Sequence, residues 1–177
     1  KNYMAGLLEN APASAVLATP TVNGFRRFTQ NSLAPDRATW GYDHRGTMIR
    51  VLGQPGKTST RFENRIGEPA ANPYLFMSSQ IISGLDGIDR NLQPWDSDDS
   101  PYEAARPLLP KSLEKAVDNL DNSQLIRQAY GDAYVDYYIG LKKAELERFN
   151  SYITENGDQD AENGISQWEQ NEYFDFF

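Results

Sequence analysis

Arginine side chains are concentrated in the first half of this acidic chain, between residues 26 and 65. Arginine binds the oxygens of phosphates and carboxylates through two parallel N–H bonds, and it keeps its charge at physiological pH. Phosphoryl transfer requires such groups around the phosphate that moves. The density of arginines therefore indicates an anion-binding site. The candidates are Arg26, Arg27, Arg37, Arg45, Arg50, Arg61 and Arg65.

One short β-rich run places a carboxylate between two arginines, in the pattern Arg61-x-Glu63-x-Arg65. Side chains alternate between the two faces of a strand, so these three point the same way. Arg45 and Arg50 lie on the preceding hairpin arm, where they can join the same charged face of the sheet. A carboxylate among arginines stays ionised, as a ligand of a hard cation must. The alternative is a surface ladder of cross-strand ion pairs without a ligand, and it has the same spacing.

The balance of charge differs between the two halves of the chain. Residues 1–88 hold nine Lys or Arg and six Asp or Glu, whereas residues 89–177 hold eight and nineteen. The formal net charge of −8 argues against nucleic-acid binding, and the acidic second half is typical of solvated helices. No apolar run reaches the length of a transmembrane helix, about 18 residues, so no membrane partner is expected. The absence of cysteine excludes disulfides, thiolate metal sites and a cysteine nucleophile, and it fits a reducing compartment.

Short runs rich in Thr, Val, Ile and aromatic residues predict the strands that carry the arginines. The runs are 38–42, 47–52 and 59–65, and turn residues such as Gly46 separate them. Residues 24–37 are interpreted as a further strand followed by a loop. The predicted fold class is α+β, with antiparallel strands between about residues 24 and 65 and packed helices behind them.

Helical spacing of apolar residues, together with capping residues, predicts helices on both sides of the strands. A helix should end near Leu8, and a short one should be closed by Gly131. The other predicted segments are a helix from Pro73 to about Leu85 with a small apolar face, an irregular excursion over 91–110, helices from Ser112 to Leu120 and from Asp132 to Phe149 or Tyr152, a polar flexible loop over 156–164, and an amphipathic end over 165–177 that includes Phe176.

Several motifs resemble the C-terminal part of the glutamine synthetase catalytic domain. The strongest pair is A-A-N-P-Y-L at 70–75 followed by G-L-D-G-I at 84–88, and the family's arginine spacings fit without a gap up to Gly87. The other motifs are Asn23-Gly24-Phe25-Arg26-Arg27-Phe28, Ala34-Pro35, His44-Arg45 with Ile49-Arg50, Arg61-Phe62-Glu63-Asn64-Arg65, and the tail Ser166-Gln167-Trp168-Glu169-Gln170-Asn171-Glu172-Tyr173-Phe174. The resemblance implies that residues 1–177 are the C-terminal part of such a domain, without its N-terminal β-grasp domain and the first part of the catalytic domain.

The resemblance implies an ATP-dependent ligase of nitrogen metabolism, which joins the γ-carboxyl of L-glutamate to ammonia or an organic amine through γ-glutamyl phosphate. It also implies a role for each matched residue. Arg27 and Arg65 bind glutamate, Arg45 stabilises the transferring phosphoryl group, Arg50 and Arg61 bind the ATP phosphates, and Glu63 binds Mg²⁺ or Mn²⁺. His44 matches no ligand position of the family, so it is interpreted as a hairpin residue.

The sequence departs from the family at the loop that carries Ala34-Pro35. The family usually has a glutamate directly before this pair, which helps to bind and deprotonate ammonium, and this chain has Leu33 there. A leucine side chain cannot accept a proton, but it can line an apolar slot for an organic amine. The alternative is that Leu33 merely packs the loop.

Three hypotheses about function follow. The first is a fragment of an active glutamate–amine ligase, cytoplasmic and homo-oligomeric in a ring by family resemblance. Its partners are small molecules, and it is inactive as an isolated chain because further metal ligands lie upstream. The second is a non-catalytic, glutamine-synthetase-like structural protein. The third is an acidic helical module with a basic anion-binding hairpin. The first residues enter an apolar helical pattern without a cap, so we expect them to continue a longer protein.

Overall fold

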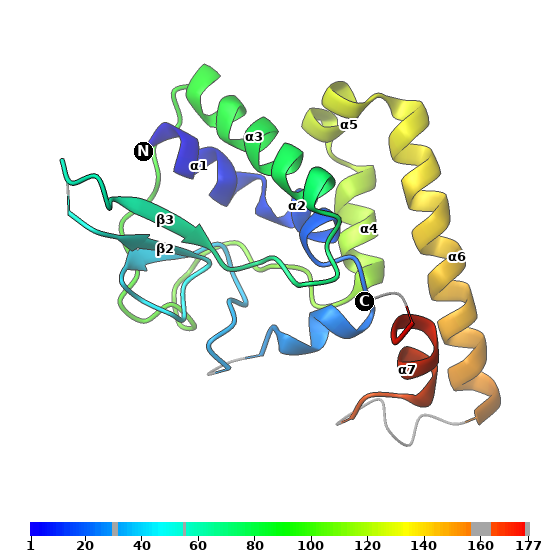
Figure 1. Cartoon of the computed structure of the whole chain (residues 1–177). Coiled ribbons are helices and arrows are strands. Elements are labelled where there is room, and N and C mark those ends of the chain that lie inside the picture. Colours follow the sequence, from blue (N-terminus) through cyan, green and yellow to red (C-terminus); the bar gives the residue numbers. More distant parts are fainter. Residues whose placement is uncertain (30–31, 55, 157–163, 176–177) are drawn as a thin grey trace.

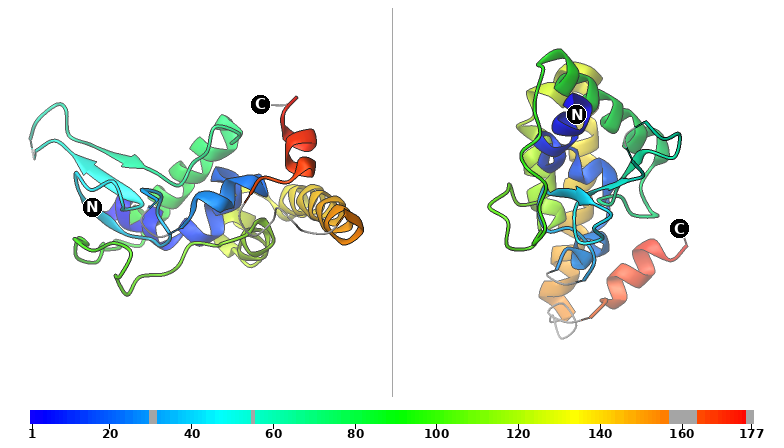
Figure 2. Two further views of the ribbon diagram at one scale, coloured as in Figure 1. Left: turned by 90° about the horizontal axis from the view of Figure 1, so that it is seen from below. Right: turned by 90° about the vertical axis from the view of Figure 1, so that its left-hand side faces the viewer.

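The computed structural model describes residues 1–29, 32–54, 56–156 and 164–175, and it has an α+β fold (Figure 1). A small sheet lies at one side of a helical layer, and the longest helix lies at the other (Figures 1 and 2). The elements in chain order are α1 (Asn2–Glu9), α2 (Ala11–Ala18), η1 (Asn23–Arg27), β1 (Trp40–Tyr42), β2 (Ile49–Leu52), β3 (Arg61–Asn64), α3 (Pro73–Asp89), α4 (Leu113–Asp121), α5 (Gln124–Tyr130), α6 (Asp132–Asn156) and α7 (Gln167–Tyr173).

The sheet has the order β1-β2-β3 and is mixed. The predicted strands exist, and β2 pairs with β3 antiparallel, but the prediction of antiparallel pairing is wrong for β1, which runs parallel to β2. A parallel connection usually needs a long crossover. Here β1 spans only three residues, about 7 Å of chain, so the short segment 43–48 can return along it. Asp43, at φ 50°, starts that return.

The strand predicted from residue 24 is wrong, because the chain forms the 3₁₀ helix η1 there. Residues three apart face the same side of a 3₁₀ helix. Phe25 and Phe28 use this spacing to pack edge to face, with ring centroids 5.8 Å apart, and both are buried. Burial of the two rings fixes η1 and directs Arg26 and Arg27 to different partners.

Helix α1 packs closely against α3, which has the small apolar face that the sequence predicted. A Cβ added to Gly6 would lie 2.8 Å from Gly87 N, and one added to Gly87 would lie 2.6 Å from Gly6 N. Asn72 caps α3 by accepting a hydrogen bond from Tyr74 N at 3.0 Å. The predicted helix from Pro73 is confirmed and continues beyond Leu85 to Asp89.

The remaining predicted helices are confirmed as α1, α4, α5 and α6. Ser112 caps α4 by accepting from Lys115 N at 3.2 Å, and Gly131, at φ 85°, ends α5. Helix α6 runs beyond Tyr152 to Asn156. Most of the predicted polar loop over 156–164, and Phe176 of the predicted amphipathic end, lie outside the described residues.

The irregular excursion predicted over 91–110 contains no helix or strand among its residues. It lies along β1, where Asp98 N donates to Trp40 O at 2.9 Å, and along the segment before β1, where Leu109 N donates to Asp36 O at 2.9 Å. Within the described residues, no helix has both the length and the apolar character that crossing a membrane requires.

A buried ion pair attaches α7 to η1. Arg26 donates two hydrogen bonds to Glu169, each 2.9 Å long, and the Glu169 residue is only 1% exposed. The Ser166 hydroxyl and backbone also donate to Glu169 in a capping box. Burial raises the pKa of the Glu169 carboxyl, but the bonds from Arg26 and Ser166 outweigh burial and place the pKa below its usual value.

We expect acid to release α7. Because the folded-state pKa of Glu169 lies below that of the unfolded chain, the pair stabilises the fold fully above about pH 4.3, and this contribution is lost as the pH falls through the folded pKa. The ring of Trp168 on α7 lies 5.2 Å from that of Phe149, so its fluorescence should change in a step when acid releases α7. The Glu169→Gln variant should lack the step, and an unchanged acid profile in that variant would assign the step to another group.

Candidate functional site

A cluster of charged side chains on β2 and the end of β3 forms the centre of the candidate site, and we call Arg50, Glu63 and Arg65 the Glu63 cluster. The strand register places Arg50 opposite Glu63. Arg50 Nη1 donates to Glu63 Oε2 at 3.3 Å, and Arg65 Nη1 donates to Glu63 Oε1 at 2.9 Å. Arg50 also pairs with Asp43 through Nε at 2.9 Å. A carboxylate between two arginines is therefore present, as the alternation predicted, but its second arginine is Arg50 and not Arg61.

Arg65 also binds the loop that precedes the sheet. Its Nη2 donates to the Leu33 carbonyl at 3.0 Å, and Tyr102 donates its hydroxyl to the Ala34 carbonyl at 3.1 Å. Leu33 has φ 59°, a left-handed conformation that is rare for a large side chain and raises its energy. The two side-chain bonds hold the loop in this conformation. Leu33 is 56% exposed beside the Glu63 cluster.

Arg27 is placed beside the same cluster by η1. Its Nη2 donates to the Ile66 carbonyl, and its guanidinium lies 5.0 Å from the centroid of the Phe28 ring. Burial lowers the Arg27 pKa, the charge of Glu68 raises it, and the charge of Arg65 lowers it, with a net shift downward. Two guanidinium groups that repel each other in this way favour an anion between them.

Arg27 and Arg65 share a further property. The Nε atom of each is buried and has no hydrogen-bond partner among the described residues. Burying a donor without a hydrogen-bond partner lowers the stability of the folded state by about 1–3 kcal/mol. An anionic ligand that accepts from both donors would explain why they lack partners, and a surface ion-pair ladder would not.

Arg45 and Arg61 lie apart from the Glu63 cluster. Arg61 is exposed on β3 and donates from Nη1 to the Ser59 carbonyl at 3.0 Å. Arg45 is exposed in the turn between β1 and β2, where it forms no hydrogen bond or ion pair with the described residues. His44 in the same turn accepts from Gly46 N at 3.1 Å, as expected of a hairpin residue. Both arginines are thus available to a ligand without first breaking an ion pair.

The residues present do not by themselves fit a divalent-metal site. Glu63 supplies one carboxylate, and the described part of the chain contains no group of three or more His, Cys, Asp or Glu that could hold a metal ion. Mg²⁺ requires about six oxygen ligands. Glu63 can therefore be only one ligand of a site that other groups complete.

Two neighbours of the site were missed by the sequence reasoning. Glu68 accepts hydrogen bonds from Thr21 behind η1, and Tyr102 holds the loop of Leu33. Glu68 stands two residues before the A-A-N-P-Y-L motif, with Pro69 between them, and that position is the one signal in the sequence that marks it. Tyr102 lies in the irregular excursion, where no periodicity indicates a contact.

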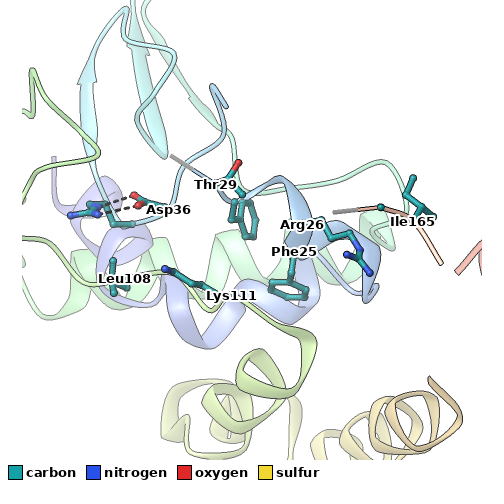
Figure 3. A pocket seen from close by; sticks show the side chains of 10 residues that line it. Phe25, Arg26, Thr29, Asp36, Leu108, Lys111 and Ile165 are labelled. Atoms are coloured by element: carbon teal, nitrogen blue, oxygen red, sulfur yellow. Dashed lines mark hydrogen bonds and ion pairs between the residues drawn. The ribbon is translucent and has the colours of Figure 1, made fainter. Parts of the chain in front are cut away.

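A separate cavity of about 700 Å³ lies near η1, and none of the residues to which the resemblance assigns a role lines it (Figure 3). Its charged side chains include Asp36, which pairs with Arg37, and Lys111. Arg26 borders it as well, and its guanidinium is bound to Glu169. The cavity is therefore distinct from the candidate site.

Comparison with known proteins places these residues in a family. Residues 1–159 match the family model described as glutamine synthetase, catalytic domain. The chain is 45% identical to a gamma-glutamylanilide synthase of Acinetobacter, over 97% of this chain and 34% of that protein. It is 32% identical to a glutamine synthetase of Pyrococcus horikoshii, over 97% and 40%. It is 33% identical to a gamma-glutamylethanolamide synthetase of Streptomyces coelicolor, over 88% and 33%.

The chain spans about a third to two fifths of the length of these relatives. The matched residues include η1, the sheet and the Glu63 cluster. The match covers most of the chain, and it agrees with the motifs and with the α+β fold. The chain belongs to the glutamine synthetase family, and it matches the catalytic domain of that family.

Proposed function

We propose that the chain is part of an ATP-dependent ligase that joins the γ-carboxyl of L-glutamate to an amine through γ-glutamyl phosphate. In this proposal residues 1–177 are the C-terminal part of the catalytic domain, and the N-terminal β-grasp domain and the first part of the catalytic domain belong to the complete ligase. The observation that carries the proposal is the pair of partly unsatisfied guanidinium groups, Arg27 and Arg65, beside the exposed Leu33 loop.

Each arginine has a proposed role. Arg27 and Arg65 bind the carboxylates of glutamate, because their charges converge and repel each other without an anion. Arg50 and Arg61 bind the ATP phosphates, and the exposed Arg45 stabilises the phosphoryl group in transfer. An oxygen of the γ-carboxylate attacks the γ-phosphorus of ATP, the bond to the β–γ bridging oxygen breaks, and ADP leaves. The arginines offset the charge on the moving phosphate.

Glu63 is the proposed protein ligand of Mg²⁺ or Mn²⁺ in this part of the domain. Arg50 and Arg65 hold its two oxygens, so the carboxylate is oriented before any ligand arrives. The other metal ligands must come from the complete ligase or from the ATP phosphates, because Glu63 is a single carboxylate. A divalent metal would supply charge neutralisation at the phosphates.

The acceptor is proposed to be an organic amine rather than ammonia. The amine nitrogen attacks the acyl carbon of γ-glutamyl phosphate, phosphate leaves, and the nitrogen loses a proton. Ammonium would need a carboxylate to bind it and accept its proton, and Leu33 does neither. Two of the relatives are named for γ-glutamyl products of organic amines. Each methylene of an amine buried against Leu33 would contribute about 0.8 kcal/mol.

A product assay of the complete ligase tests the proposal. The enzyme is supplied with L-glutamate, ATP and either ammonium or a panel of alkyl and aryl amines, and the γ-glutamyl products are identified by mass. Formation of a γ-glutamyl amide with stoichiometric ADP release supports the proposal. Efficient formation of glutamine, with none of the amines accepted, would leave Leu33 as a packing residue of the loop.

Leu33→Glu should shift the enzyme from the amine toward ammonia. The new carboxylate can bind ammonium and accept its proton, and it removes the apolar contact, so we expect the ratio of kcat/KM for ammonia to that for the amine to rise about 100-fold. The matched control is Leu108→Glu, since Leu108 is similarly exposed at 54% and lies outside the Glu63 cluster. An equal ratio in the two variants would contradict the assignment of Leu33.

The proposal also includes that the complete ligase is a homo-oligomer in the cytoplasm. The outer face of α3 carries exposed apolar side chains at helical spacing, among them Met77, Ile81 and Ile88. Apolar side chains aligned on one helix face are typical of a surface that another part of a protein covers. This supports contact with the remainder of the ligase or with further copies of the chain, and sedimentation of the complete ligase measures the copy number.

A further inference from the structure

Glu68 is a carboxylate that lies behind the candidate site and contacts η1, the segment that carries Arg27. It follows β3 in the loop that leads to α3, and its own backbone N–H donates to the Ala18 carbonyl at 3.0 Å. Its Oε1 accepts two hydrogen bonds from Thr21, from the hydroxyl at 2.9 Å and from the backbone N–H at 3.2 Å. The carboxylate therefore connects the loop before α3 to the start of η1.

The connection continues into η1 itself. The Thr21 hydroxyl, which donates to Glu68, also accepts from Gly24 N at 2.9 Å. A Cβ added to Gly24 would lie only 2.5 Å from Glu68 Cδ and would clash with its carboxylate. The glycine thus lets η1 pack directly on the carboxylate, and Arg27 follows three residues later on the same short helix. The position of the Arg27 backbone depends on Glu68.

The charge of Glu68 acts on the Arg27 side chain as well. Arg27 is partly buried beside Arg65, and Glu68 is the carboxylate whose charge opposes that repulsion. Burial raises the pKa of the Glu68 carboxyl, and the hydrogen bonds from Thr21 and the charges of Arg27 and Lys142 act against that rise. Among the described residues no hydrogen bond joins the Glu68 and Arg27 side chains. The guanidinium therefore keeps its N–H groups for the Ile66 carbonyl and for a ligand.

We propose that Glu68 is a positioning residue for Arg27, which fixes η1 through Thr21 and Gly24 and offsets the charge of Arg65 without occupying the guanidinium. The inference rests on the proposed function, because it assigns Glu68 to the binding of glutamate by Arg27. Glu68 touches neither substrate nor reacting atoms in this arrangement. Its loss should therefore weaken glutamate binding more than it slows the chemical step or weakens ATP binding.

The test is the Glu68→Gln variant of the complete ligase. The amide keeps an oxygen that can accept from Thr21 and keeps the size of the side chain, but it removes the charge. We expect the KM for glutamate to rise about tenfold, while kcat and the KM for ATP change less than about threefold. Glu9→Gln is the control, because Glu9 is an exposed carboxylate that pairs with Arg90 away from the site.

A double-mutant cycle separates action through Arg27 from a general loss of structure. In the Arg27→Ala background, Glu68→Gln should raise the KM for glutamate by less than about twofold, because the residue through which it acts is gone. An undiminished effect in that background would overturn the inference, and so would an unchanged KM for glutamate in Glu68→Gln alone. If the Gln variant does not fold, Glu68→Asp replaces it, since it keeps the charge and shortens the reach to Thr21.

The failure of the proposed function gives a different result. If Arg27→Ala itself leaves the KM for glutamate unchanged, then Arg27 does not bind glutamate and the proposed function fails at this residue. The inference is then decided by a crystal structure of the Glu68→Gln variant. A displaced η1 and Arg27 would support the positioning role, and an unchanged position of both would overturn it.

Discussion

Arg65→Lys should lower kcat/KM for glutamate about 1,000-fold in the complete ligase. Arg65 binds Glu63 through Nη1 and the Leu33 carbonyl through Nη2, and it lies beside Arg27. An ammonium group is a single point of charge and cannot reproduce the fork. The loss of two charge-assisted hydrogen bonds of the guanidinium, each worth about 1.5–3 kcal/mol, accounts for a decrease of this size in kcat/KM. The variant should also use the amine less efficiently, because the Leu33 carbonyl loses its hydrogen bond from Arg65.

The control for this substitution is Arg90→Lys. Arg90 likewise binds two acceptors, Glu9 and Asp86, but it does so at the end of α3, away from the Glu63 cluster. We expect its steady-state kinetics to stay within about twofold of the unmodified enzyme. Steady-state kinetics with glutamate, ATP and amine varied in turn provide the comparison. Normal kinetics in Arg65→Lys would show that the fork is not required and would remove Arg65 from the site.

Gly6→Ala should strongly destabilise the packing of α1 against α3. The new Cβ would lie 2.8 Å from Gly87 N and closer still to the Ser83 carbonyl, and both are backbone atoms that cannot turn aside. The two helices α1 and α3 must then move apart. Overpacking of this kind lowers the free energy of unfolding by about 3 kcal/mol. The change in the midpoint of chemical unfolding measures it.

Gly140→Ala is the matched control for Gly6→Ala. Gly140 lies in α6 with open space where a Cβ would stand, so the alanine should stabilise the helix by about 1 kcal/mol. The two variants should therefore shift the unfolding midpoint in opposite directions. A stabilising effect of Gly6→Ala would mean that α1 and α3 do not pack as closely as described.

Helices α3, α4 and α5 could be predicted from the sequence because their signals are local. Ser112 caps α4, Gly131 ends α5, and Asn72 with Pro73 starts α3. The direction of β1 could not be predicted, because it depends on how the 43–48 segment returns over a strand of three residues. The strand predicted from residue 24 is the 3₁₀ helix η1 instead, because the burial of Phe25 and Phe28 at a spacing of three residues favours that helix.

The candidate site was predicted in its residue types but only partly in its pairings. Strand alternation placed Arg61 and Arg65 on either side of Glu63, whereas the cross-strand register brings Arg50 to it. Register between strands is a tertiary property, which alternation within one strand does not contain. The role of Glu68 was inaccessible for the same reason, because its partner Thr21 lies 47 residues earlier in the chain.

The transfer of the γ-phosphoryl group to glutamate, measured before any amine is added, tests the account most directly. The complete ligase is mixed with glutamate and with ATP that carries ¹⁸O in the β–γ bridge. Reversible phosphorylation of glutamate leaves bound ADP, whose β-phosphate rotates and moves the label to a nonbridging position. We predict exchange that requires glutamate and is lost in Arg45→Ala. Exchange that does not depend on glutamate, or no exchange together with no γ-glutamyl product from any amine or from ammonium, would contradict the account.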